Sequence, residues 1–224
     1  MMLYFSTMDK KIFLYFFSGT GNTLWVSRQF AGEMAKHKFE TELLPLPAPA
    51  PVDLPEAAIL AIAFPVYAQT APPFICEWMR NLPETRKNTP VILISTLAGF
   101  SGLVKGPFRH MLEKKGYRPL AVSEFIMPPN YFHKYDEPKN EAIRESAKIA
   151  IADFAKAIAE GRATWPSRPS ILDPMQFLAE KMFKHGGSSW LGRGFKADGK
   201  CTRCGLCMKL CPVKSIVPDA EGRP

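Results

Sequence analysis

The stretch Tyr-Phe-Phe-Ser-Gly-Thr-Gly-Asn-Thr, residues 15–23, joins an apolar run to a helical pattern through a loop of small polar residues. The apolar run before the loop covers residues 11–17. It is continuously apolar after its first residue, a lysine, which is typical of a strand buried on both faces. Residues 24–38, which follow, repeat with a helical period. Two glycines allow a tight turn with inward-pointing backbone N–H groups, and the helix adds its own unpaired N–H groups and positive dipole end. This unit predicts a site for a phosphate monoester that requires no lysine or arginine.

Two other phosphate-binding motifs fit this loop less well. A Walker loop ends in Gly-Lys-Ser/Thr, whereas Asn22-Thr23 stands here and the next lysine is Lys36, so hydrolysis of a nucleoside triphosphate is not favoured. A dinucleotide fingerprint requires a third glycine where this chain has Leu24. Its acidic ribose ligand would be Glu40 or Glu42, which lie too near the start of the second strand. A turn rich in Gly and Ser that binds nothing is the remaining alternative.

Short apolar runs alternate with helical patterns along most of the chain, which predicts an α/β domain with a parallel sheet covered on both faces. The expected strands are residues 11–17, 39–44, 57–64, 90–96 and 118–126. The expected helices are residues 24–38, 74–82, 106–115 and 141–160. The repeating face of the first helix consists of Leu24, Ser27, Arg28, Ala31, Met34 and Ala35. The Pro-rich residues 45–55 are expected to be irregular.

Residues 15–23 closely resemble the FMN phosphate loop of flavodoxins, and the order of strands and helices resembles that family over about residues 11–160. The resemblance implies an open parallel five-stranded sheet of order 2-1-3-4-5, with FMN at the carboxyl ends of strands one and three. In such a site the FMN phosphate would be bound by Ser18, Gly19, Thr20, Gly21, Asn22 and Thr23.

The same resemblance places the isoalloxazine ring of FMN between the loops after strands three and four. The residues implied as ring contacts are Pro65, Val66, Tyr67, Ala68, Thr96, Leu97, Ala98, Gly99 and Gly102. Tyr67 is expected to stack flat on the ring, and the alternative for it is a half-buried packing aromatic. Gly99 and Gly102 let the backbone approach the ring edge, and Asn130-Tyr131 is expected to form a further wall.

Four of the five cysteines fall within eleven residues, as Cys201-x-x-Cys204-x-x-Cys207-x-x-x-Cys211-Pro212. This is the bacterial ferredoxin spacing for a [4Fe–4S] cluster. Structural zinc sites usually show two separated ligand pairs instead, so iron–sulfur is favoured over zinc. Four basic residues near the run would compensate the charge of an anionic cluster: Lys200, Arg203, Lys209 and Lys214.

The ligand set of this cysteine module is incomplete for a two-cluster ferredoxin. In such ferredoxins the fourth cysteine of one run binds the other cluster, and a second run returns a cysteine to the first. The sequence contains no second run, and the isolated Cys76 is expected to be a small buried hydrophobe. Three explanations stay open: the chain is truncated, Cys211 is recruited to the same cluster with strain, or the site has degenerated. The chain resembles fusions of an N-terminal flavodoxin-like domain with a C-terminal two-cluster ferredoxin, which favours truncation.

The net charge of +8 is concentrated in the C-terminal part of the chain. Residues 1–160 carry 18 basic and 16 acidic side chains, whereas residues 161–224 carry 11 and 5. A cluster within this part explains the excess better than nucleic acid does, because no basic stripe with interleaved aromatics accompanies it. A composition 46% hydrophobic and 22% charged excludes wholesale disorder. No apolar run approaches the ~18 residues of a membrane helix and no signal peptide is evident, so a cytoplasmic protein without a membrane span is expected.

The expected domains are a flavodoxin-like FMN-binding domain at residues 11–161, a linker at 162–194 with a docking helix near residues 173–184, and an iron–sulfur module at 195–224. The resemblance implies an electron-transfer flavoprotein that passes electrons between the cluster, FMN and redox partner proteins. An FMN-dependent reductase of a quinone-type acceptor that uses NAD(P)H is the alternative, and a non-redox scaffold is a third. No residue is assigned a catalytic role, and the sequence leaves open whether the protein is an enzyme.

Overall fold

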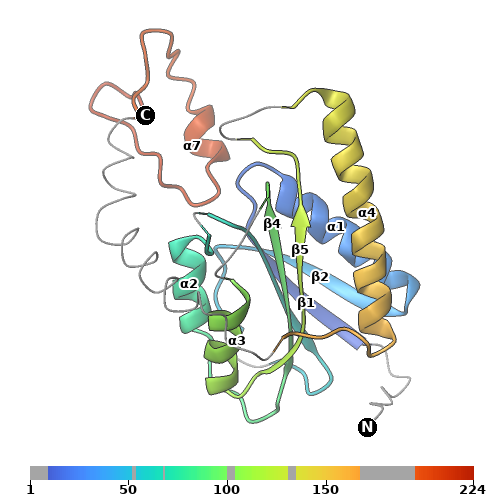
Figure 1. Ribbon diagram of the computed structural model, residues 1–224. Helices are drawn as coiled ribbons and strands as arrows, with labels where there is room; N and C mark the ends of the chain where they lie inside the picture. Colours follow the sequence, from blue (N-terminus) through green and yellow to red (C-terminus); the bar gives the residue numbers. More distant parts are fainter. Residues whose placement is uncertain (1–9, 52–53, 68, 100–103, 131–134, 167–194) are drawn as a thin grey trace.

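The computed structural model describes residues 10–51, 54–67, 69–99, 104–130, 135–166 and 195–224 (Figure 1). The strands among these residues are β1 (Lys10–Phe16), β2 (Phe39–Pro45), β3 (Ile59–Pro65), β4 (Pro90–Leu97) and β5 (Arg118–Ile126). They form one parallel sheet in the order β2-β1-β3-β4-β5. The flavodoxin-like strand order expected from the sequence is therefore confirmed.

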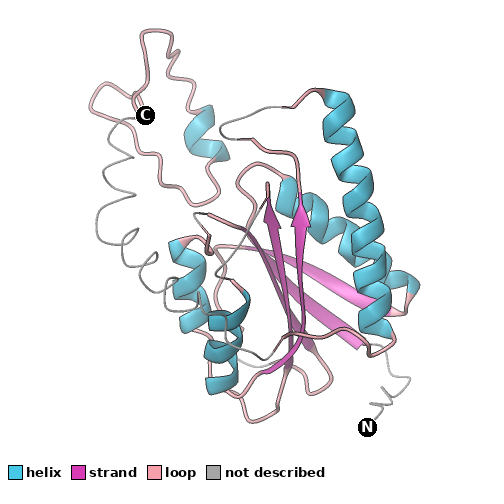
Figure 2. Cartoon of the chain, in the orientation of Figure 1, coloured by secondary structure: helices cyan, strands magenta, loops and turns pink. Residues whose placement is uncertain are grey.

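Helices cover both faces of this sheet (Figure 2). They are α1 (Asn22–Lys36), α2 (Pro73–Arg80), α3 (Lys105–Lys114) and α4 (Glu137–Ala159). Helices α1 and α4 pack on one face, and α2 and α3 pack on the other. A short helix, α7 (Leu206–Leu210), lies in the C-terminal segment. The three-layer α/β architecture predicted from the alternation of apolar runs and helical patterns is confirmed.

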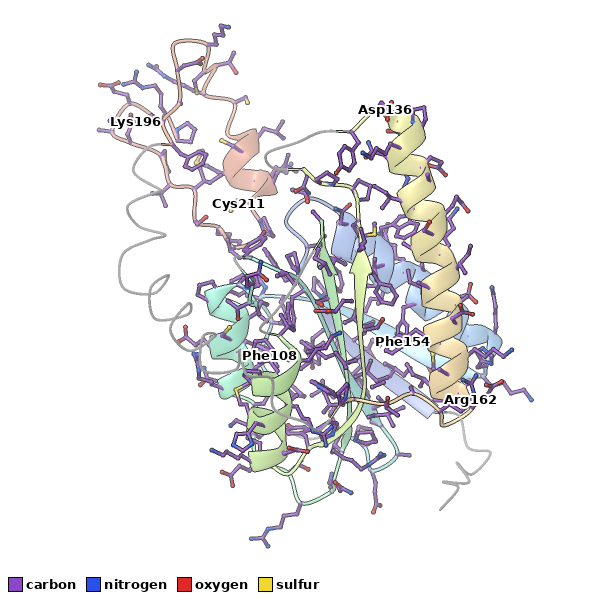
Figure 3. The ribbon with its side chains drawn as sticks, viewed as in Figure 1. Phe108, Asp136, Phe154, Arg162, Lys196 and Cys211 are labelled. Carbon is purple, nitrogen blue, oxygen red and sulfur yellow. The ribbon has the colours of Figure 1, made fainter. Side chains whose placement is uncertain are left out.

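Side chains of the central strands alternate between two apolar cores. In β1, Ile12 and Leu14 face α1 and α4, whereas Tyr15 faces α2 and α3. Phe154 of α4 and Phe108 of α3 lie on opposite sides of the sheet and mark the two cores (Figure 3). Because parallel strands all end at the same edge of a sheet, the loops after β1, β3 and β4 are brought together there.

Helix α1 presents a different face to the sheet from the one predicted. Its buried residues are Thr23, Val26, Ser27, Phe30 and Met34. Arg28 and Ala35, which the periodicity placed on the repeating face, are exposed. The helix also starts at Asn22 rather than at residue 24. A face that carries Val26 and Phe30 buries more apolar surface than one that carries Arg28, which explains the observed rotation.

Helix α4 begins at Glu137 rather than at residue 141. The side chain of Asp136 caps it by accepting a hydrogen bond from the Lys139 N–H at 3.2 Å, and Pro138 lies in the first turn. This first turn is polar and exposed, so the apolar period that marks a helix in the sequence begins only after it.

The chain after α4 crosses from one face of the sheet to the other. Ala163 packs against the core under α1 and α4, while Trp165 is buried in the opposite core. The Trp165 Nε1–H donates to the Lys105 carbonyl at 2.9 Å, and the Arg109 guanidinium donates to the Trp165 carbonyl at 2.6 Å. These contacts attach the crossing segment to α3.

The residues predicted to form a linker therefore begin with a packed segment that includes Ala163 and Trp165. The predicted docking helix near residues 173–184 lies outside the described residues. The domain boundaries at 161 and 194 remain a prediction. No helix within the described ranges is both long enough and apolar enough to cross a membrane.

A buried hydroxyl pair joins α1 to β4, and its removal should lower stability. Thr23 Oγ1 and Thr96 Oγ1 are 2.8 Å apart, and both side chains are buried. We expect Thr23→Val or Thr96→Val alone to reduce the free energy of unfolding by about 1–3 kcal/mol, because each leaves a buried hydroxyl without a partner. The double variant should lose less than the sum of the two single losses. Urea unfolding measures all three.

Thr41→Val is the matched control, because the Thr41 hydroxyl is buried and has no hydrogen-bond partner among the described residues. Its replacement should leave the free energy of unfolding unchanged or raise it. A loss in the double variant equal to the sum of the losses in Thr23→Val and Thr96→Val would contradict the pairing of the two hydroxyls.

Candidate functional site

The loop between β1 and α1 presents backbone N–H groups at an open surface. Gly21, which precedes the first residue of α1, has φ of 102°, a conformation that favours glycine, and its N–H donates to Ser18 Oγ at 3.1 Å. No side chain caps α1, so the N–H groups of its first turn have no side-chain acceptor among the described residues. Gly19, Thr20 and Gly21 are exposed. An anion can therefore approach these donors directly.

Two of the side chains predicted to bind phosphate form hydrogen bonds within the protein. The Asn22 side-chain amide donates to the Pro128 carbonyl at 2.9 Å. The Thr23 hydroxyl is paired with Thr96 beneath the loop. The donors that remain for a ligand include the backbone N–H groups other than that of Gly21, the hydroxyls of Ser18 and Thr20 and the second amide N–H of Asn22. Ser18 Oγ accepts the Gly21 N–H, which leaves its own hydroxyl proton available.

The loop after β5 reaches the phosphate loop from across the sheet. The Asn130 side-chain amide donates to Thr20 Oγ1, and Pro128 in the same loop accepts the hydrogen bond from Asn22. The sequence predicted Asn130 as a wall of the site but did not predict this contact. Tyr131, the other predicted wall residue, lies outside the described residues.

Tyr67, in the loop after β3, lies next to Gly19 of the phosphate loop. Reciprocal hydrogen bonds of 2.8 and 3.0 Å join the backbones of Tyr67 and Thr70, and Gln69 between them has φ of 70°. The Tyr67 hydroxyl lies 3.0 Å from the position that a Cβ atom on Gly19 would occupy. Its side chain nevertheless remains 47% exposed, and the partial burial raises the pKa of the phenol by desolvation. The ring expected to stack on a flavin thus has its hydroxyl beside the phosphate loop.

The remaining predicted ring contacts differ in how accessible they are. Pro65 ends β3 and is half-buried, and the Val66 N–H donates to the Thr96 carbonyl at 2.8 Å. The Leu97 carbonyl accepts from the Met127 N–H at 2.8 Å.

Ala98 and Gly99 are exposed, and a Cβ atom on Gly99 would meet no other atom within 4 Å. Ala68 and Gly102 lie outside the described residues. Tyr67, Ala98 and Gly99 therefore offer the open surface between these loops, and their contact with a flavin ring stays a prediction.

The four cysteines of the C-terminal run lie at the surface. Cys201 and Cys211 are partly exposed, and Cys204 and Cys207 are exposed. Within the described ranges, no three side chains of His, Cys, Asp or Glu converge on a common metal position. Cys76 is buried in α2, as predicted, where burial raises the pKa of its thiol and its Sγ lies 3.5 Å from the Ala71 carbonyl.

Hydrogen bonds around two of these sulfurs favour the thiolate, the form that binds iron. Gly205 has φ of 70°, and in this turn the Leu206 N–H lowers the pKa of the Cys204 thiol. The Ser215 hydroxyl, 3.4 Å from Cys211 Sγ, and the Ser215 N–H lower the pKa of the Cys211 thiol to about 7. A donor set of four thiols with N–H groups aimed at sulfur fits an iron–sulfur cluster. The groups that donate hydrogen bonds to Cys204 Sγ are different from those that donate to Cys211 Sγ.

Comparison with known protein families identifies the C-terminal segment. Residues 198–217 match the model of the 4Fe-4S binding domain. The iron–sulfur module expected from the cysteine spacing is confirmed by this match. Among curated proteins, none matches the chain.

Solved structures with a similar chain path include several flavodoxins. A short-chain flavodoxin associated with a bacterial microcompartment is 14% identical, with a TM-score of 0.48, and the match covers 68% of this chain and 99% of the other. The two-electron reduced flavodoxin of Megasphaera elsdenii is 16% identical, with a TM-score of 0.43, and the match covers 62% of this chain and 98% of the other. Rubredoxin oxygen:oxidoreductase from Desulfovibrio gigas is 15% identical, with a TM-score of 0.44, and the match covers 70% of this chain. It covers only 38% of the oxidoreductase, so this chain spans well under half of that protein's length. The strand order itself establishes the flavodoxin-like fold.

The backbone of the phosphate loop should not tolerate a side chain at position 21. We expect Gly21→Ala to lower the free energy of unfolding by about 1–2 kcal/mol, because φ of 102° is unfavourable for an L-residue. No atom lies within 4 Å of the added Cβ, so the loss is conformational rather than steric.

Gly32→Ala, in the exposed middle of α1, is the matched control, because its Cβ also meets nothing within 4 Å and its backbone is helical. That variant should gain about 1 kcal/mol. Equal effects of the two substitutions in thermal or urea unfolding would show that Gly21 is not conformationally required.

Proposed function

We propose that this protein is an electron-transfer flavoprotein, which holds FMN at the carboxyl edge of its sheet and a [4Fe–4S] cluster in residues 195–224. The observation that carries the proposal is the uncapped start of α1 beside an exposed loop of glycines and hydroxyls. Together with a confirmed iron–sulfur segment on the same chain, it supports electron transfer between two centres.

The phosphate loop suits a phosphate ester better than a free carboxylate or a neutral group. Its backbone N–H groups at residues 19–24, apart from that of Gly21, and the hydroxyls of Ser18 and Thr20 are short donors in one loop, which suits an ion with three acceptor oxygens. The positive end of α1 compensates part of the phosphate charge without any basic side chain.

The surface beside the phosphate loop suits a flat aromatic group. Tyr67 is fixed by its backbone bridge to Thr70 and keeps nearly half of its side chain exposed. Ala98 and Gly99 on the neighbouring loop are small and exposed, so a ring can approach their backbone closely. Bound FMN would supply one- and two-electron chemistry at this position, while the protein would bind and orient it.

The C-terminal module would hold its cluster through Cys201, Cys204 and Cys207, and Cys211 would bind either a second cluster or, in the absence of a second run, this one. Lys200, Arg203, Lys209 and Lys214 would balance the negative charge of the thiolates and iron. The same basic residues favour redox partner proteins with acidic surfaces. In this proposal the flavodoxin-like domain is residues 11–161, the linker 162–194 and the iron–sulfur module 195–224.

Independent loss of the two centres tests the proposal. Protein purified without oxygen and supplied with FMN and iron should show both flavin and cluster absorption, with one FMN bound per chain. Thr20→Leu should weaken FMN binding at least about 10-fold, through the loss of a hydrogen bond to a charged group, and should leave the iron content unchanged. Cys207→Ser should lower the iron content and leave FMN binding unchanged.

Thr20→Ser, which keeps the hydroxyl, is the control for the flavin site and should bind FMN nearly as the parent protein does. The proposal fails for the flavin if the parent protein binds no FMN. Parallel loss of flavin and iron in both variants would contradict separate sites.

The choice of electron donor separates this function from an NAD(P)H-dependent quinone-type reductase. The iron–sulfur segment on the same chain supports reduction by proteins rather than by a nicotinamide, although a reductase could bind nicotinamide at the flavin face without the fingerprint that Leu24 interrupts. We expect a reduced ferredoxin-type donor to reduce the loaded protein much faster than NADH or NADPH in stopped-flow measurements. Multiple turnovers of NAD(P)H with a quinone would instead establish the reductase.

A further inference from the structure

The loop after β5 contacts the phosphate loop although β3 and β4 lie between β5 and β1 in the sheet. Two side-chain hydrogen bonds cross the gap. Asn22 of α1 donates to the Pro128 carbonyl at 2.9 Å, and Asn130 donates in the opposite direction to Thr20 Oγ1. Residues 128–130 are thereby attached to both ends of the Thr20–Asn22 segment.

The bond from Asn130 determines what Thr20 can offer to a ligand. Because the Thr20 oxygen accepts the amide N–H, its own hydroxyl proton is left to be donated elsewhere. Asn130 has a second amide N–H, for which no acceptor is recorded among the described residues. Both residues are exposed, so two donors from different loops stand together at the edge of the N–H cluster at the start of α1.

We propose that Asn130 belongs to the phosphate site, where it orients the Thr20 hydroxyl and donates its second N–H to the ligand, and thereby makes the site selective for phosphorylated flavin over riboflavin. This inference rests on the proposed function, since it assigns a further residue to the same site. Asn22 donates one amide N–H to the Pro128 carbonyl and acts as a positioning residue for the loop.

A purely structural role for Asn130 leads to a different expectation. If Asn130 only braced the loop after β5, its removal would affect every flavin equally or would lower the stability of the fold. If its donors contact the phosphate, its removal affects only ligands that carry the phosphate. Riboflavin, which has the same ring and ribityl chain without the phosphate, distinguishes the two roles.

The experiment compares FMN and riboflavin affinities, measured by quenching of flavin fluorescence, for the parent protein, Asn130→Ala and Asn130→Asp. We expect Asn130→Ala to weaken FMN binding roughly 10-fold, as for loss of a hydrogen bond to a charged group, and to leave riboflavin binding within about 2-fold. Asn130→Asp should weaken FMN binding further, because a carboxylate accepts the Thr20 proton and repels the phosphate. Asn81→Ala, at the exposed C-terminal end of α2, is the matched control and should change neither affinity.

A second readout is the ³¹P NMR signal of bound FMN, which should shift in both Asn130 variants at saturating FMN and not in the control. Equal losses for FMN and riboflavin, or no loss for either, would overturn the assignment of Asn130. Failure of the parent protein to bind FMN would instead refute the proposed function, so the two failures are distinguishable.

Discussion

The site depends on backbone N–H groups at the start of α1 that have no side-chain acceptor among the residues the structure describes. Unpaired donors of this kind are costly when buried, yet they make a ready anion site when a short loop keeps them open to solvent. Gly21 supplies the positive φ that turns the chain into the helix, and the neighbouring exposed residues leave room for a ligand. The buried Thr23–Thr96 contact fixes this helix start to β4, which carries the loop proposed to border the flavin ring.

The order of strands in the sheet places other loops around the phosphate loop, so that the site has several walls. Because β1, β3 and β4 are parallel neighbours, their loops emerge at one edge, and the apolar cores on both faces hold that edge in place. Tyr67 and Asn130 then reach the phosphate loop from two different loops, those after β3 and β5. Phosphate and ring recognition are thus separate tasks, carried by backbone donors in one place and by a fixed aromatic and small residues in another.

Much of the fold could be predicted from the sequence, because buried strands are continuous apolar runs and the β1–α1 motif is specific. What escaped prediction depends on tertiary contacts. The rotation of α1 follows from the burial of Val26 and Phe30, and Trp165 is packed although it stands in a segment that resembles a linker. Three side-chain hydrogen bonds join residues about 70 to 110 positions apart, which no local sequence pattern can indicate. They are the hydrogen bonds of Asn22 with Pro128, of Thr23 with Thr96 and of Asn130 with Thr20. The cysteine run was predictable because its spacing alone specifies the chemistry.

The central claim is that the N–H groups of residues 19–24, apart from that of Gly21, hold a flavin phosphate. Backbone ¹H–¹⁵N NMR spectra of the flavodoxin-like part of the intact chain, recorded with and without FMN, test it most directly. The amide signals of Gly19, Thr20, Asn22 and Leu24 should move strongly downfield on FMN addition and much less with riboflavin. Unchanged signals at these four residues, in protein that binds FMN, would contradict the account.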